Sequence, residues 1–179
     1  RELTNENDMV IDPFMGSGTT IVEAMVQGRI GVGVDINPVA HLIARAKSTP
    51  LEPASLQHAY EKIADALEST KRIKVDPPDN ERIDYWFPPA QKARLAFLLH
   101  RIGAIRDEDP RDFFLVAFAQ ILKSCSIWLQ RSVKPTRDLR KTPADPFVAF
   151  QRQVRYMLKQ NQIFWDTVPL RVRENPNAY

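Results

Sequence analysis

The sequence predicts an α/β fold in which two strand–helix units are followed by a mainly helical region. An apolar run at residues 9–11 leads through the glycine-containing run 12–20 into an amphipathic stretch at 21–26, which is the order of a strand, a tight loop and a helix. A second apolar run, 31–34, ends at Asp35. Beyond it, apolar residues recur mostly at helical spacing, so few further strands are expected.

The later elements follow from local signals in chain order. Asn37 is a good helix cap and Pro38 is tolerated in a first turn, so a helix is expected from there to about residue 47. Apolar periodicity predicts further helices over about 54–70, 88–105, 112–129 and 147–164. Three segments are expected to be irregular: the proline-rich residues 76–80, the aromatic residues 85–87 and the basic residues 131–146. These signals divide the chain into an N-terminal α/β part, residues 1–50, and a helical part, residues 51–179.

The aromatic residues raise two expectations of their own. Trp128 falls in the apolar helix expected over 112–129 and is interpreted as a core residue. Tyr85-Trp86-Phe87 either packs helices together or contacts a base or a cofactor, and the sequence leaves both interpretations open.

The glycine loop and Asp35 together indicate a site for a cofactor that contains ribose. Glycines let the backbone approach a ligand, N–H groups at a helix N-terminus favour an anionic group, and an acid at the end of the next strand accepts ribose hydroxyls. The distance from loop to acid is close to the roughly 20 residues that this arrangement requires. Two common motifs do not fit, because Ile21 stands where the dinucleotide fingerprint needs its third glycine and no lysine precedes Thr19-Thr20 as in a P-loop.

Two motifs carry a resemblance to a known family. The first is Asp12-Pro13-Phe14-Met15-Gly16-Ser17-Gly18-Thr19-Thr20, and the second is Gly33-Val34-Asp35-Ile36-Asn37-Pro38. They resemble the first two motifs of the amino-methylating DNA methyltransferases, the adenine-N6 and cytosine-N4 enzymes of restriction-modification and related systems. The resemblance implies a partial Rossmann-like methyltransferase fold in the N-terminal part and S-adenosylmethionine as the cofactor.

The resemblance also implies which residues contact the cofactor. They are Asp12, Phe14, Gly16, Ser17, Gly18, Thr19, Asp35 and Ile36. Asp12 is expected to balance the cationic amino and sulfonium end, Asp35 to bind the ribose and Ile36 to pack on the adenine ring.

The chain lacks the family's catalytic tetrapeptide, in which Asp, Asn or Ser precedes Pro-Pro and an aromatic residue. Asp76-Pro77-Pro78-Asp79 invites that assignment, but Asp79 cannot stack on a flipped base and no buried strand is expected before it. No catalytic residue is therefore assigned. The chain is interpreted as a cofactor and recognition portion whose catalytic motif lies in the remainder of the methyltransferase or in a second subunit. Two alternatives stay open, a non-catalytic DNA-binding subunit that retains the cofactor fold and an RNA methyltransferase.

The charge distribution suits contact with phosphates, and together with the resemblance it points to DNA as the partner. The net charge is only +3, but basic residues outnumber acidic ones in the segment 131–173. Phosphate contacts are expected from Arg131, Lys134, Arg137 and Arg140. The alternative for this segment is a solvated basic face.

Composition excludes several other classes. No run approaches 18 apolar residues, so no membrane span is expected. Cys125 has no cysteine partner in the chain, which fits a reducing, cytoplasmic compartment. The histidines are isolated and have no cysteines at metal-ligand spacing, so no metal site is predicted.

Overall fold

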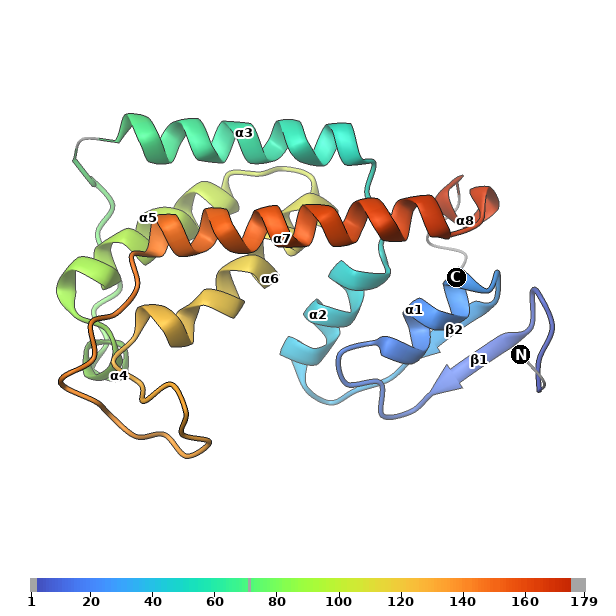
Figure 1. Ribbon diagram of the computed structural model, residues 1–179, viewed down its shortest axis with the longest axis horizontal. Helices are drawn as coiled ribbons and strands as arrows, with labels where there is room; N and C mark the ends of the chain where they lie inside the picture. Colours follow the sequence, from blue (N-terminus) through green and yellow to red (C-terminus); the bar gives the residue numbers. More distant parts are fainter. Residues whose placement is uncertain (1–2, 71, 175–179) are drawn as a thin grey trace. The chain divides into compact units, whose positions relative to one another are not determined.

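The computed structural model describes residues 3–70 and 72–174 (Figure 1). Within them the fold is mixed α/β and mostly helical, with one two-stranded parallel sheet, which confirms the α/β class. The contacts divide the chain into two compact units. The first contains the described residues up to Gln57 and from Leu158 onward, and the second contains residues 58–157.

The sheet of the first unit is formed by β1 (Met9–Asp12) and β2 (Ile30–Gly33), joined through helix α1 (Thr19–Val26) (Figure 1). The strands run parallel, with Met9 opposite Ile30 and Asp12 opposite Gly33. Parallel neighbours require such a crossover connection. Gly31 allows the helix to lie close to β2, since a Cβ there would be 2.9 Å from Cγ2 of Ile21.

The core of the first unit joins segments from both ends of the described chain. Ile21 and Met25 of α1 pack with Val168, which directly follows α7, and with Val172 in α8 (Leu170–Glu174). Arg171 fastens the same region, because its Nη2 atom donates to the carbonyl of Gly28 at 2.8 Å and to the Glu6 carboxylate at 3.2 Å. Helix α2 (Pro38–Ser48) completes the elements that lie wholly in this unit.

The second unit is helical. It contains α4 (Glu81–Trp86), α5 (Pro89–Gly103) and α6 (Glu108–Cys125), and the unit boundary falls within α3 (Pro53–Ser69) and α7 (Pro146–Thr167). Phe114 of α6 is fully buried and packs against Phe113 and Phe150, with ring centroids 5.4 and 6.4 Å away. In the described part of the chain, no helix has the length and apolar character needed to cross a membrane.

The expected loop at Tyr85-Trp86-Phe87 is wrong, because Tyr85 and Trp86 belong to helix α4. Asn80 starts that helix, and its side-chain oxygen accepts from the backbone N–H groups of Arg82 and Ile83 at 2.9 and 3.3 Å. Such capping supports a helix too short to show apolar periodicity.

The expected end of the apolar helix at residue 129 is also wrong, because α6 ends at Cys125. The chain leaves the helix where the N–H of Ile127 donates to the carbonyl of Trp86 at 3.0 Å. Trp128 consequently lies outside the helix and is only partly buried, contrary to its interpretation as a helical core residue.

Candidate cofactor-binding site and basic hairpin

The carboxyl ends of β1 and β2 bring the glycine loop and Asp35 together. The N–H of Val34 donates to the carbonyl of Asp12 at 2.9 Å, and the N–H of Met15 donates to the carbonyl of Val34 at 3.1 Å. The N–H of Gly16 then donates to Oδ2 of Asp35 at 3.0 Å. Two motifs separated in the sequence are thereby joined at one edge of the sheet.

The Asp35 carboxylate is oriented by two backbone donors. Its Oδ2 atom accepts from Gly16 and its Oδ1 atom accepts from the N–H of Asn37 at 2.8 Å. Asn37 in turn caps α2, because its side chain accepts from the N–H of Val39 at 2.9 Å. A carboxylate oxygen can accept two hydrogen bonds, so each Asp35 oxygen keeps acceptor capacity for a hydroxyl group.

The two glycines of the loop differ in what surrounds them. Gly18 has φ +76°, and a Cβ on it would lie 2.7 Å from Cβ of Ala44 in α2. Gly16 has φ +50°, but a Cβ there would meet nothing within 4 Å. Gly18 is therefore required by packing and backbone conformation, whereas Gly16 borders open space beside Asp35.

Helix α1 begins directly after this loop. Gly18 is its N-cap residue and provides no side-chain hydrogen bond to the first turn. Uncapped N–H groups and the helix dipole favour an anionic group at such a position. Lys47 adds positive charge here, because its Nζ atom donates to the carbonyl of Ser17 at 2.8 Å.

Asp12 is held in its ionised form. A hydrogen bond from the Thr20 hydroxyl, followed in size by one from the N–H of Phe14 at 3.0 Å, lowers the pKa of the Asp12 carboxyl below its ordinary value. Two large apolar side chains of the same motifs, Phe14 and Ile36, stand 88% and 101% exposed. The expected cofactor residues thus include a stable anion and two apolar groups open to a ligand.

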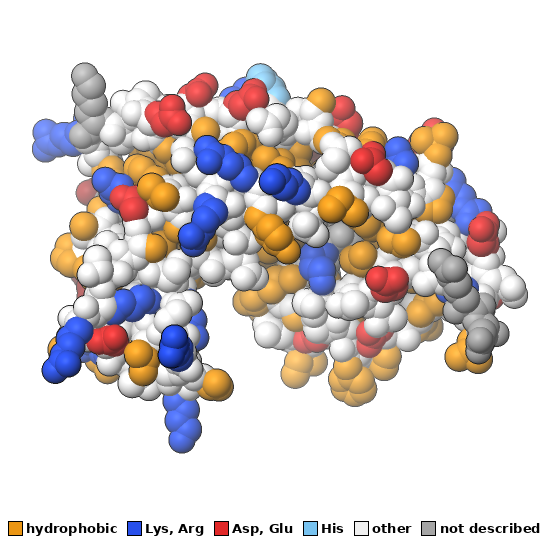
Figure 2. Space-filling model, in the orientation of Figure 1, with side chains coloured by type: hydrophobic (Ala, Val, Ile, Leu, Met, Phe, Trp, Pro, Cys, Tyr) orange, Lys and Arg blue, Asp and Glu red, His pale blue; other side chains and the backbone are white. Residues whose placement is uncertain are grey.

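The expected DNA-binding residues lie in or next to a hairpin, residues 127–138, which we call the basic hairpin. Trp128 and Arg137 form an antiparallel bridge. The N–H of Leu129 donates to the carbonyl of Thr136 at 2.8 Å, and the N–H of Asp138 donates to the carbonyl of Ile127 at 2.8 Å. All four cations are exposed: Arg131, Lys134, Arg137 and Arg140. Figure 2 shows basic side chains gathered on the connection between α6 and α7.

Two further lysines, which are not among those four, donate to backbone carbonyls in and next to this hairpin. Lys123 donates from Nζ to the carbonyl of Ser132 at 3.1 Å. Lys141 donates from Nζ to the carbonyls of Lys123 and Trp128, each at 2.9 Å. Burial lowers the pKa of Lys141.

Aromatic side chains of α4 contact the hairpin through a row of rings with a cation at each end. The Arg137 guanidinium lies 4.2 Å from the Tyr85 ring centre, and Tyr85 meets Trp86 edge-on at 5.0 Å. Trp86 stacks on Trp128 at 5.2 Å, and Lys123 lies 5.3 Å from the Trp128 ring centre. Of the two interpretations of the aromatic run, the structure supports packing for Trp86. Periodicity could not reveal this contact, because it joins residues 42 positions apart in different elements.

Asp76-Pro77-Pro78-Asp79 lies in the irregular connection between α3 and α4. In the described residues of that connection no strand leads into it. This placement agrees with a proline turn between helices, as the sequence indicates.

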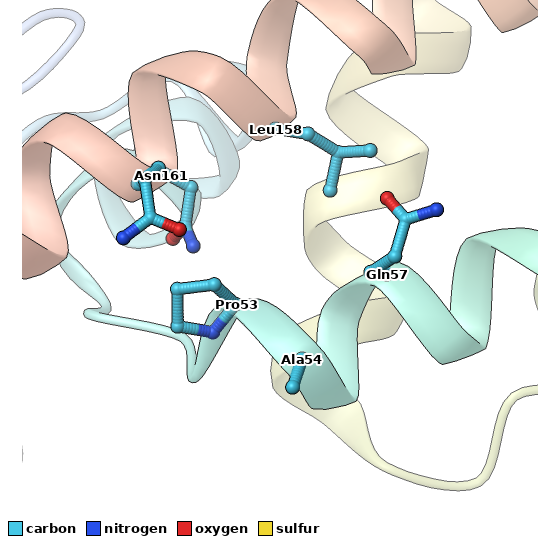
Figure 3. Close-up of a pocket in the computed structure, with 6 residues that line it drawn as sticks. Pro53, Ala54, Gln57, Leu158 and Asn161 are labelled. Atoms are coloured by element: carbon cyan, nitrogen blue, oxygen red, sulfur yellow. The ribbon is translucent and has the colours of Figure 1, made fainter.

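A hollow of about 410 Å³ lies near the start of α3 (Figure 3). Its lining residues are Pro53, Ala54, Gln57, Leu158, Asn161 and Gln162. Asn161 is nearly buried, and its side-chain amide donates to the carbonyl of Leu51 at 2.8 Å. Amide and apolar groups supply no acid, base or nucleophile, and none of the lining residues belongs to the cofactor loop. Sequence reasoning did not single out this hollow, since its two sides are distant in the chain.

Comparisons with known proteins agree with the two motifs. A profile described as DNA methylase matches residues 1–46. Type II methyltransferase M.MvaI of Kocuria varians is 32% identical over 136 residues, which make up 70% of this chain and 29% of that protein. Type II methyltransferase M.MjaII of Methanocaldococcus jannaschii is 40% identical over 77 residues, or 43% of this chain and 14% of that protein. No solved structure matches.

The chain spans less than a third of the length of these curated relatives. The family profile covers both the glycine loop and Asp35, the residues that the structure joins by a hydrogen bond. These motifs, this profile and these relatives together support a DNA amino methyltransferase family for this chain.

Proposed function

We propose that this chain is the cofactor-binding and DNA-recognition part of an S-adenosylmethionine-dependent methyltransferase that acts on an exocyclic amino group of adenine or cytosine in DNA. The observation that carries the proposal is the hydrogen bond from Gly16 to Asp35 at the carboxyl ends of two adjacent parallel strands. Ligands of open α/β sheets bind at that edge.

The residues present fit the cofactor's chemistry. Asp35 has free acceptor capacity on both oxygens for a pair of ribose hydroxyls. Open space borders Gly16, the first turn of α1 suits a carboxylate, and the ionised Asp12 suits a cationic amino or sulfonium group. Ile36 offers an exposed apolar surface for the adenine ring. S-adenosylmethionine would supply an activated methyl group, and these side chains would bind and orient it.

The sheet itself supports a role as part of a larger protein. Met9, Ile11, Val32 and Val34 are 58%, 61%, 36% and 56% exposed. Alternate residues of a strand point to one face, so this sheet has an uncovered apolar face. A two-stranded sheet is marginal alone, and we propose that further parts of the methyltransferase cover it.

The catalytic motif is proposed to come from those further parts. The Pro-Pro pairs of this chain are followed by Asp79 and Ala90, neither of which is aromatic. The same observation favours a second candidate, a DNA-binding subunit that retains the cofactor fold without chemistry.

Replacement of Asp35 by Ala tests the cofactor site. It should weaken S-adenosylmethionine binding to the intact protein by about 1–3 kcal/mol, the scale for losing hydrogen bonds to a charged group. Isothermal titration calorimetry measures this change. Glu23→Ala, which removes an exposed acid from α1, is the matched control and should bind normally. Equal affinities for both variants and the original protein would refute the ribose role of Asp35.

A further inference from the structure

We infer that the tip of the basic hairpin enters the major groove of DNA, where Val133 contacts base edges and contributes to sequence preference. The inference rests on the proposed function, because it assumes that the hairpin binds DNA. It assigns to Val133 a role different from the phosphate contacts expected of the surrounding cations.

Val133 is the most exposed apolar side chain of the hairpin, at 95%. It follows Ser132 and precedes Lys134, and Arg131 and Lys134 are also exposed. An apolar side chain in water between two cations adds nothing to the core of the second unit. The exposure of Val133 is explained if Arg131 and Lys134 bind backbone phosphates while the valine contacts base edges in the groove.

The tip has a defined shape before any partner binds. The N–H of Ser132 donates to the carbonyl of Leu129 at 3.0 Å, its hydroxyl donates to the carbonyl of Lys134 at 2.7 Å, and its carbonyl accepts from Lys123 at 3.1 Å. The Thr136 hydroxyl also donates to the carbonyl of Lys134, at 3.1 Å. A preorganised tip loses little conformational entropy on binding, so Val133 can contact a base at small cost.

The dimensions and chemistry favour the major groove. That groove is about 12 Å wide and admits a two-stranded ribbon, whereas the minor groove is about half as wide. A small apolar side chain in the major groove distinguishes thymine by contact with its C5-methyl group. Arg131 and Lys134 on either side would fix the position of the tip along the duplex.

Selection of duplexes from a randomised DNA library by the intact protein tests this inference. The original protein should enrich a sequence, and Val133→Ser should lose about 10-fold of its preference at one or two adjacent base pairs. Its affinity for duplexes without the enriched sequence should stay unchanged. Val133→Thr keeps one methyl group and should retain much of the preference.

Val148→Ser is the matched control, since Val148 is 67% exposed and lies in α7, outside the basic hairpin. It should enrich the original sequence. Val133→Ser with an unaltered preference would overturn the inference and leave the proposed function standing. Failure of the original protein to bind any duplex would overturn the proposed function and this inference together.

Discussion

Asp12 is the last residue of β1 and Asp35 follows the adjacent strand β2, yet their carboxylates have different partners. Asp35 accepts from backbone donors of both motifs, whereas Asp12 accepts mainly from the Thr20 hydroxyl within its own motif. The lowered pKa of Asp12 means that the folded state favours its ionised form. The resulting stabilisation is present above the pKa of the unfolded chain and is lost as the pH falls through the folded-state pKa.

Thr20→Val should raise the pKa of Asp12 toward its ordinary value of 3.8, because the largest cause of its lowering is removed. Titration of the side-chain carboxyl by NMR measures the change. Thr19→Val, at the exposed preceding position, should leave the Asp12 titration unaltered. An unchanged pKa in Thr20→Val would contradict the assigned hydrogen bond.

The two loop glycines should respond differently to alanine. Gly18→Ala should lower the free energy of unfolding by about 1–2 kcal/mol from its left-handed backbone alone, and contact with Ala44 adds to that loss. Gly16→Ala meets no neighbour and should cost about 1–2 kcal/mol from its left-handed backbone alone. Urea denaturation gives both values. Gly16→Ala should nevertheless weaken cofactor binding, and equal stability losses with normal binding would contradict this division of roles.

At the scale of elements, the basic hairpin presents cations on a framework held by backbone hydrogen bonds and by the Trp86–Trp128 stack. Replacement of the four expected phosphate-binding residues by alanine should lower DNA affinity. It should also reduce the slope of the logarithm of the binding constant against the logarithm of the salt concentration by up to about four units. The four positions are Arg131, Lys134, Arg137 and Arg140.

A control of equal charge distinguishes phosphate contact from a general loss of positive charge. Lys62, Arg72, Lys74 and Arg82 are exposed in the same unit but outside the hairpin. Their joint replacement should change the salt slope little. Titrations of duplex DNA at several salt concentrations compare the two sets, and a slope unaffected by the hairpin set would identify it as a solvated face.

At the scale of the whole molecule, the 179-residue chain alone should transfer no methyl group. Transfer to an exocyclic amine requires a flipped base, acceptors for the amine and a donor aligned behind it. Incubation with DNA and tritiated S-adenosylmethionine measures transfer, and a longer protein that includes a Pro-Pro-aromatic motif serves as the comparison. Label transferred by the short chain and abolished by Asp76→Ala would show that Asp76 belongs to the catalytic motif. If neither protein transferred label, the result would favour a non-catalytic subunit.

Local sequence was sufficient for the N-terminal elements. The order of β1, the glycine loop, α1 and β2 follows from contiguous apolar and glycine patterns, and the start of α2 follows from Asn37 and Pro38. These features depend on backbone conformation and on interactions between residues a few positions apart. The sequence therefore predicted both motifs of the candidate site, although the roles of their residues in binding a cofactor remain predictions.

Packing alone decided the features that join distant residues. Val168 and Val172 share a core with Ile21 and Met25, and α8 was not expected from the sequence. Directly after α6, the N–H of Ile127 donates to the carbonyl of Trp86 in α4, a contact between elements distant in the chain. The periodicity of apolar residues indicates which face of an element is buried but not which distant element covers that face. These contacts can therefore be seen only in the tertiary structure.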